Sequence, residues 1–338
     1  MIWLTWRQFR VQAVTVYALL AVLAALLVIA GPPLGSGGPL VQGDGYLYDA
    51  GITAVFGLPA LIGVFWGAPL VTRELETGTY RLVWNQGVTR TRWLAVKLAV
   101  AGLAAVAAAG LLSLAVTWWA APVDAASRPG TILVDLITPD TGLFTARLSP
   151  LVFGARGIVP AGYAAFAFVL GVAAGILLRR TVPAMAATLM VFAAVQVAVP
   201  FAVRPYLLPP AQESVTITVA NLSKIGVDDS GGLADLAVAG PRGAWVLANE
   251  TVDASGRVTR PPSWLAGCVL PAGQQIPLRP SFSEECFAKL SGQGYRQLVT
   301  YQPAGRFWAL QWIETALFLL LTALLTWLCF RWTRHRLT

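Results

Sequence analysis

The sequence T-R-E-L-E-T-G-T-Y-R-L-V-W-N-Q-G-V-T-R-T-R-W-L-A-V-K, residues 72–97, is a charged segment between two long apolar runs. Arg73, Glu74 and Glu76 end the first run, and Gly78 follows them. Four basic residues then precede the second run: Arg81, Arg90, Arg92 and Lys97. The core of a soluble protein does not need charges in this order. The pattern instead indicates a loop that joins two membrane spans.

The composition on either side of this segment is that of a membrane protein. Hydrophobic residues make up 57% of the chain and charged residues 12%, and the mean hydropathy is +0.66. Soluble domains have about 45–50% apolar and about 25% charged residues. Six segments contain the roughly 20 apolar residues that a span requires: residues 13–30, 52–71, 94–119, 160–178, 182–203 and 308–330. The first exceeds the about 7–15 apolar residues of a signal peptide, so we expect a retained span.

The charges of the connecting loops predict the orientation. With six spans, both termini lie on one side, and that side carries 12 basic and two acidic residues. The other side carries 12 basic and 13 acidic residues, while Glu314 lies inside the last span. Because basic residues concentrate in cytoplasmic loops, both termini are predicted to be cytoplasmic. Eight tryptophans near the span ends are assigned to interfacial anchoring rather than to ligand binding: Trp3, Trp6, Trp84, Trp93, Trp118, Trp119, Trp308 and Trp332.

The predicted fold is an all-α integral membrane protein with six transmembrane helices and a small extracytoplasmic α+β domain between spans five and six. Residues 1–203 form the transmembrane region with spans one to five and the loop 72–97. Residues 204–306 form the extracytoplasmic domain, in which the alternation over residues 215–219 predicts a strand. Residues 307–338 form span six and a basic cytoplasmic tail.

Two of the three cysteines, Cys268 and Cys286, fall in the predicted extracytoplasmic domain. Disulfides persist outside the cytoplasm, and a bridge that closes a loop of this length stabilises a domain by about 3 kcal/mol through chain entropy. We therefore predict a Cys268–Cys286 bridge. Two free thiols are the alternative.

The segment 72–97 resembles the cytoplasmic loop after the second span in the membrane subunits of ATP-binding cassette (ABC) transporters of the ABC type 2 (ABC-2) family. In that family an Arg-Glu pair, a Gly and often a Tyr-Arg lie on a short helix that docks on the ATPase. The matching positions, with Glu76 beside them, form the predicted ATPase-coupling set: Arg73, Glu74, Glu76, Gly78, Thr79, Tyr80 and Arg81. Residues 88–90 and Lys97 are similar to the family's entry into the third span. The resemblance covers nearly all of the chain.

The resemblance implies a permease subunit in a bacterial plasma membrane, working as a dimer with an identical or related permease chain. It also implies a separate ABC ATPase subunit that binds ATP and Mg, and efflux of an amphipathic or hydrophobic compound such as a drug, lipid or peptide. The chain itself is not expected to be an enzyme or to bind a cofactor. None of its three lysines, Lys97, Lys224 and Lys289, follows a glycine, so a phosphate-binding G-x-x-x-x-G-K-[ST] loop is absent from the sequence.

The sequence also contains little that indicates metal or nucleophile chemistry. His335, the only histidine, lies in the Arg-rich tail, so neither a His-based zinc site nor a catalytic triad is expected. Glu314 and Gln311, three residues apart on the last span, share one helix face. An intramembrane carboxylate is a functional candidate by default. Glu314 is either a gating residue or a structural hydrogen-bonding group near the external interface, within reach of Arg306 or water.

Alternatives remain for the charged segment and for the whole chain. Glu74 and Glu76 either position the coupling helix or pair with Arg73 and neighbouring arginines at a solvated helix end. The chain is either a permease or a non-transporting membrane sensor or assembly protein whose external domain binds a ligand. A membrane-embedded enzyme ranks last, because Gln196 and Glu314 are too few and lie at different depths.

Overall fold

The computed structural model describes residues 2–30, 42–79, 89–126, 147–227, 233–269 and 284–335. The chain divides into two compact units. We call the first the helical unit; it comprises Met1–Ala125, Pro150–Leu207 and Trp308–Thr338. The second, the sheet unit, comprises Ala126–Ser149 and Leu208–Phe307.

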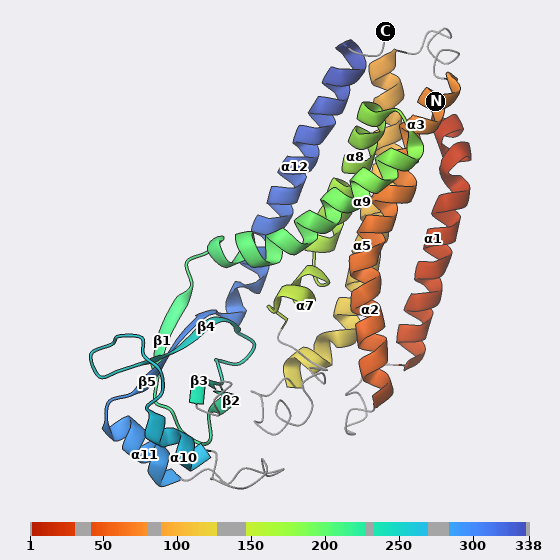
Figure 1. Ribbon diagram of the computed structural model, residues 1–338. Coiled ribbons are helices and arrows are strands. Elements are labelled where there is room, and N and C mark those ends of the chain that lie inside the picture. Colours follow the sequence, from red (N-terminus) through yellow and green to blue (C-terminus); the bar gives the residue numbers. More distant parts are fainter. Residues whose placement is uncertain are drawn as a thin grey trace. The chain divides into compact units, whose positions relative to one another are not determined.

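The described residues contain six helical segments that are long and apolar enough to cross a membrane, as predicted. They extend over Phe9–Ala30, Tyr46–Thr77, Arg90–Ala121, Val159–Leu178, Thr181–Tyr206 and Ala304–His335. The helices that build them are α1 (Ile2–Ala30), α2 (Gln42–Leu61), α3 (Ala68–Thr77), α5 (Arg90–Ala126), α8 (Val159–Leu178), α9 (Thr181–Ala198) and α12 (Phe307–His335). A short helix, α7 (Pro150–Gly154), precedes α8. Both ends of the chain lie at the same end of this helical unit (Figure 1).

The second span is one helical path with a π-helical segment, η1 (Ile62–Gly67), between α2 and α3. Pro59 and Pro69 lie on either side of η1. A proline has no N–H, so Pro69 leaves the carbonyl oxygen of Phe65, four residues earlier, without its helical donor. The side-chain amide Nε2 of Gln12 on α1 lies 3.5 Å from that oxygen and donates to it. The irregularity of the span thus places a polar contact between α1 and η1, as freed carbonyls in a membrane require.

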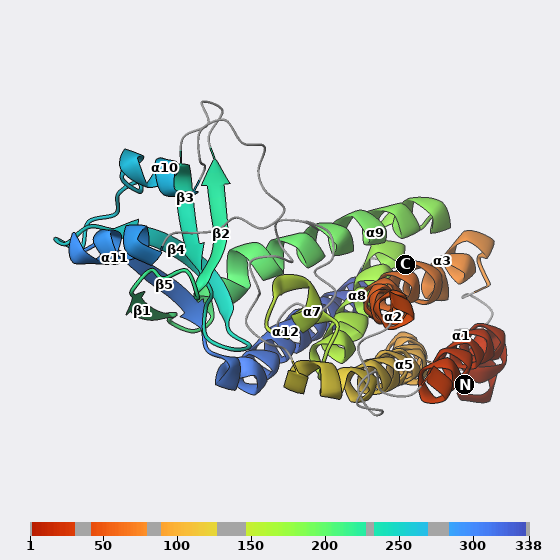
Figure 2. The ribbon, with the colours of Figure 1, turned by 90° about the horizontal axis from the view of Figure 1, so that it is seen from below.

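Helix α8 is the centre of the helical unit, and α2, α5, α9 and α12 surround it (Figures 1 and 2). Its Gly171 packs against Gly63 and Gly67 of η1, and its Gly175 packs against Ala68 and Thr72 of α3. A Cβ atom on Gly63 would lie 2.7 Å from the carbonyl oxygen of Ala167, which is closer than real Cβ contacts allow. The two G-x-x-x-G sequences therefore serve close packing inside this chain.

Replacing Gly67 by Leu is expected to destabilise the helical unit by about 1–3 kcal/mol, because the new side chain overlaps the backbone of Phe168. Thermal unfolding of the detergent-purified chain measures the effect. Gly110→Leu on α5 is the matched control, since a Cβ atom at Gly110 meets nothing within 4 Å. Equal midpoints for the two variants would contradict the close approach of η1 and α8.

The sheet unit contains five described strands, all late in the chain: β1 (Ala211–Val215), β2 (Leu222–Val227), β3 (Leu233–Val238), β4 (Trp245–Val252) and β5 (Arg296–Gln302). One antiparallel sheet has the order β1-β5-β4, and β2 and β3 form a separate antiparallel pair (Figure 2). Helices α10 (Ala266–Val269) and α11 (Glu284–Gly292) complete it. Its buried core includes Ile217, Leu236, Leu265, Leu290 and Val299.

The sequence predicted a strand and a disulfide in this unit. The strand predicted at residues 215–219 is wrong, because β1 ends at Val215. The Asn221 side chain accepts a hydrogen bond from the Thr218 backbone N–H at 2.8 Å and donates one to the Thr216 carbonyl, which turns the backbone there. Cys286 is disulfide-bonded. The side chain of Cys268 lies outside the described residues, so its pairing with Cys286 stays a prediction.

Candidate functional site

Helix α3 carries three of the predicted coupling residues, Arg73, Glu74 and Glu76, and a buried ion pair attaches it to α5. Glu74 Oε1 accepts a hydrogen bond from Lys97 Nζ at 2.6 Å, and Glu74 Oε2 accepts one from Trp93 Nε1 at 3.1 Å. Lys97 also donates to the carbonyl oxygen of Leu70 at 3.1 Å. The Lys97 and Glu74 side chains are only 5% and 13% exposed, so neither charge is well hydrated and each depends on the other.

The next carboxylate on α3 lies at the start of α9. Glu76 accepts hydrogen bonds from the Thr181 backbone N–H at 2.7 Å and from the Thr181 hydroxyl at 2.8 Å. The Thr181 hydroxyl also lies 3.1 Å from that of Thr72. The first N–H groups of a helix lack internal partners and form its positive end, so a carboxylate there is stabilising. Glu76 thus joins α3 to α9.

Beyond these contacts, α3 presents an exposed end. Gly78 ends the helix in the left-handed region with φ of 71°, a conformation that glycine adopts without a Cβ clash. Thr79, which follows, and Arg73 are exposed. Tyr80 and Arg81 of the predicted coupling set lie outside the described residues. We refer to Thr72, Glu74, Glu76, Trp93, Lys97 and Thr181 as the α3 cluster.

Sequence reasoning did not find the partners of these two carboxylates. It left two roles open for Glu74 and Glu76, positioning the coupling helix or pairing with Arg73 and neighbouring arginines, and it named neither Lys97 nor Thr181, which they contact. Trp93 was assigned to interfacial anchoring, but it is 1% exposed and donates to Glu74. The missed signal is the combination of a lysine and a tryptophan four residues apart on one face of α5. The function of Glu74 in docking an ATPase stays a prediction.

Lys97→Met is expected to lower the free energy of unfolding by about 1.5–3 kcal/mol, the usual contribution of hydrogen bonds to a charged group. Chemical or thermal unfolding of the purified chain measures it. Arg92→Met is the control, because Arg92 is an exposed basic residue on the same first turns of α5. If both variants unfolded alike, the Glu74–Lys97 pair would not hold α3.

A second group of buried polar residues connects α9, α8 and α12. Arg204, just after α9 and its π-helical extension η2 (Val199–Val203), pairs with Glu314 on α12. Arg204 Nε donates to Glu314 Oε2 at 2.8 Å, and Tyr163 on α8 donates its hydroxyl to Glu314 Oε1 at 2.5 Å. The side chains of Arg204 and Glu314 are both 0% exposed. We call these residues and Gln311 the Arg204 network.

Gln311, one turn before Glu314, satisfies backbone groups where α7 meets α8. Its Oε1 accepts hydrogen bonds from the N–H groups of Ile158 and Val159, each at 3.0 Å, and its Nε2 donates to the carbonyl oxygen of Phe153 at 3.1 Å. Gly157 has φ of 67°, and a Cβ atom there would lie 2.7 Å from Gln311 Oε1. Irregular backbone among membrane helices needs such partners.

The structure corrects the environment predicted for Glu314. The sequence placed it near the external interface, within reach of Arg306 or water. Instead it is fully buried against Arg204, while Arg306 donates to the Pro209 carbonyl and to Gln302 Oε1. Arg204 was missed because it is the first residue after an apolar run, where a charge reads as the start of a loop. Gating by Glu314 and Gln311 stays a prediction.

Glu314→Ala is expected to cost about 3–5 kcal/mol, because it leaves the Arg204 charge buried without its partner. The double variant Arg204→Met with Glu314→Leu removes both charges and is expected to recover most of that loss. Thermal unfolding in detergent of the native chain, Glu314→Ala, the double variant and its two single variants, Arg204→Met and Glu314→Leu, tests the pair. A double variant as unstable as the sum of its two single variants would contradict a direct interaction.

A comparison with known protein families matches the part of the chain that contains the α3 cluster. Residues 40–204 match the family model described as ABC-2 membrane transporter related. This part of the chain, a little under half of its length, is similar to the ABC-2 related membrane transporters. The matched range contains the whole α3 cluster and ends at Arg204, so the ABC-2 related region includes the residues that carried the resemblance in the sequence. No curated protein and no solved structure matches the chain.

This ABC-2 relationship and the six apolar helices support a transporter permease that crosses the membrane several times. Over the described ranges, no group of three or more His, Cys, Asp or Glu side chains is arranged to hold a metal ion. The two polar groups connect helices: Glu74 joins α3 to α5, Glu76 joins α3 to α9, and Arg204 joins the end of α9 to α12.

Proposed function

We propose that the chain is the membrane-spanning permease subunit of an ABC transporter that exports an amphipathic or hydrophobic compound. ATP and Mg bind to a separate ABC ATPase subunit, which hydrolyses the ATP. The observation that carries the proposal is the exposed end of α3. Arg73, Gly78 and Thr79 are exposed or terminal there, while the buried side of the same helix is held by the Glu74–Lys97 pair. A rigidly held helix with a polar exposed end suits a docking surface for another protein.

In this mechanism, α9 transmits motion through the helical unit. Glu76 on α3 binds Thr181 at the first residue of α9, and Arg204 just beyond the far end of α9 binds Glu314 on α12. A displacement of α3 by the ATPase would therefore act on α9 and, through the ion pair, on α12. The Arg204–Glu314 pair is fully buried, so it would move as a unit rather than dissociate.

The charge distribution and the family support the orientation and the assembly that we propose. We place the α3 end and both termini in the cytoplasm, because that side carries 12 of the 24 basic residues and only two acidic ones. The sheet unit is then extracytoplasmic, where the disulfide at Cys286 persists. We propose a bacterial plasma membrane as the location and a dimer of this chain, or of this chain with a related permease, as the working unit.

The test compares two substitutions of Gly78 for capture of a candidate ABC ATPase from detergent. Valine is disfavoured at positive φ by about 1–2 kcal/mol, whereas asparagine tolerates it. Because a Cβ atom at Gly78 meets nothing within 4 Å, both side chains fit and only the backbone preference differs. We expect Gly78→Val to reduce the bound ATPase about ten-fold and Gly78→Asn to retain it.

The alternative function, a membrane sensor or assembly protein whose sheet unit binds a ligand, predicts the opposite result. In that case the native chain captures no ATPase, and nucleotide has no effect on it. Capture that is equal for the native chain, Gly78→Val and Gly78→Asn would show that an ATPase binds elsewhere than the α3 end.

A further inference from the structure

Two adjoining cavities lie between α1 and the second span. The larger, of about 650 Å³, is apolar and runs along α1 from Val11 to Leu23, facing Thr53, Gly57 and Leu61 of α2. The smaller, of about 280 Å³, lies at the α3 end and is lined by Thr5, Phe9, Gln12, Trp66, Arg73 and Glu74, among others. Volumes of this size are typical of small-molecule sites.

The two cavities are neighbours and share two lining residues. Gln12 and Trp66 line both of them. At this junction the rings of Phe9 and Trp66 pack edge to face with their centroids 4.6 Å apart, and Gln12 donates to the Phe65 carbonyl. We call the combined space the α1 slot. It has a long apolar part and a short polar end.

The dimensions of the slot match part of a membrane lipid. From Val11 to Leu23 an α-helix rises about 18 Å, a little more than half of the about 30 Å hydrocarbon core of a bilayer. Several lining side chains, such as Leu19, Leu61 and Phe65, are more than half exposed on the surface of the chain. The slot therefore opens sideways toward the bilayer and spans about one leaflet.

The polar end of the slot carries a net positive charge. The lining has one basic and one acidic side chain, Arg73 and Glu74. Glu74 pairs with Lys97, which lies behind the lining, so with Lys97 counted this end has one positive charge in excess, next to the exposed guanidinium of Arg73. Apolar lining alone does not select a ligand inside a membrane, because lipid tails are as apolar as leucine. Selection has to come from the polar end, and this end favours an anionic group.

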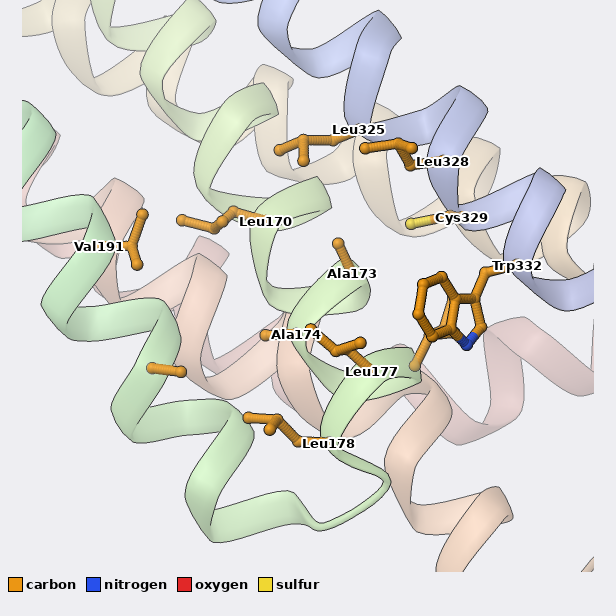
Figure 3. Close-up of a pocket in the computed structure, with 12 residues that line it drawn as sticks. Leu170, Ala173, Ala174, Leu177, Leu178, Val191, Leu325, Leu328, Cys329 and Trp332 are labelled. Atoms are coloured by element: carbon orange, nitrogen blue, oxygen red, sulfur yellow. The ribbon is translucent and has the colours of Figure 1, made fainter. Parts of the chain in front are cut away.

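Another apolar cavity of the helical unit, separate from the α1 slot, differs from it in having no charged lining. It has a volume of about 400 Å³ and is enclosed by α8, α9 and α12. Leu170, Leu177, Val191, Cys329 and Trp332 point into it from the three helices (Figure 3). Its lining contains no charged side chain, so it offers nothing with which to recognise a head group.

We propose that the α1 slot binds an anionic phospholipid from the membrane leaflet at the α3 end, with an acyl chain between α1 and α2 and the phosphate beside Arg73. The binding itself needs no partner protein. That this acidic amphiphile also represents the class of transported compound rests on the proposed function. Entry from the side of the bilayer would let a substrate reach the helices without crossing water.

The test uses the full chain, purified and delipidated in detergent, without any ATPase. It is mixed with equal amounts of dioleoyl phosphatidylglycerol and dioleoyl phosphatidylcholine, and native mass spectrometry counts the lipids retained. We expect the native chain to prefer phosphatidylglycerol about five-fold, the effect of one basic side chain at an anionic membrane surface. Arg73→Gln is expected to abolish the preference, and Arg92→Gln, an exposed arginine that does not line the slot, to keep it.

Filling variants test the apolar part. Gly57→Leu places a side chain in the larger cavity, and we expect it to reduce retention of both lipids. Gly110→Leu on α5 adds the same side chain outside the slot and is expected to behave as the native chain. Thr53→Phe fills the same cavity from another position and replaces Gly57→Leu if that variant misfolds.

Three results would overturn the site: equal retention of the two lipids by the native chain, a preference that survives Arg73→Gln, or filling variants that match Gly110→Leu. None of these lipid-retention measurements requires an ATPase. Failure of the slot and failure of the proposed coupling at Gly78 are therefore distinguishable.

Discussion

The helical unit depends on how it pairs charges that lie among apolar helices. An isolated charge in such surroundings costs several kcal/mol, so each must have a partner at short range. Glu74 meets Lys97 at one end of the unit, and Glu314 meets Arg204 at the other. Each pair joins two different spans. The ion pairs therefore specify which helices are neighbours, a constraint that apolar side chains alone do not provide in a membrane.

Between the two ion pairs, close packing of small residues fixes the distance between the second and fourth spans. Gly63 and Gly67, both in the π-helical turn η1, lie against Gly171, and Gly175 lies against Ala68 and Thr72 of α3. A π-helical turn changes the direction of side chains beyond it, and such turns are frequent at functional sites. Here it orients α3 so that Glu74 and Glu76 reach α5 and α9. The polar end of the α1 slot follows from the same geometry, since Arg73 lies beside Glu74.

Much of the helical architecture was predictable, because long apolar runs and their charged flanks are local properties of the sequence. The six spans came from such local signals. The partners of Glu74, Glu76 and Glu314 did not, since each is a contact between helices far apart in sequence. Arg204 looked like the first residue of a loop and Trp93 like part of an interfacial belt. Their burial is set by neighbouring helices that the sequence does not position.

The sheet unit shows the same limit on a smaller scale. The alternation over residues 215–219 suits a strand, but Asn221 bonds the backbone of Thr216 and Thr218 and holds a turn instead. A side chain that competes for backbone groups outweighed the local pattern. The strand that does form, β1, has mostly polar residues and exists because β5 pairs with it.

The central claim is that the α3 end is where an ATPase subunit acts, and a position-specific cross-link tests it most directly. A photoreactive phenylalanine analogue would replace exposed Thr79 at the α3 end or, as the comparison, exposed Trp308 at the other end of the helical unit. Irradiation of membranes that contain a candidate ABC ATPase should join the two chains from position 79 and not from position 308. A cross-link from position 308, or from neither position while the ATPase co-purifies with the chain, would contradict the account.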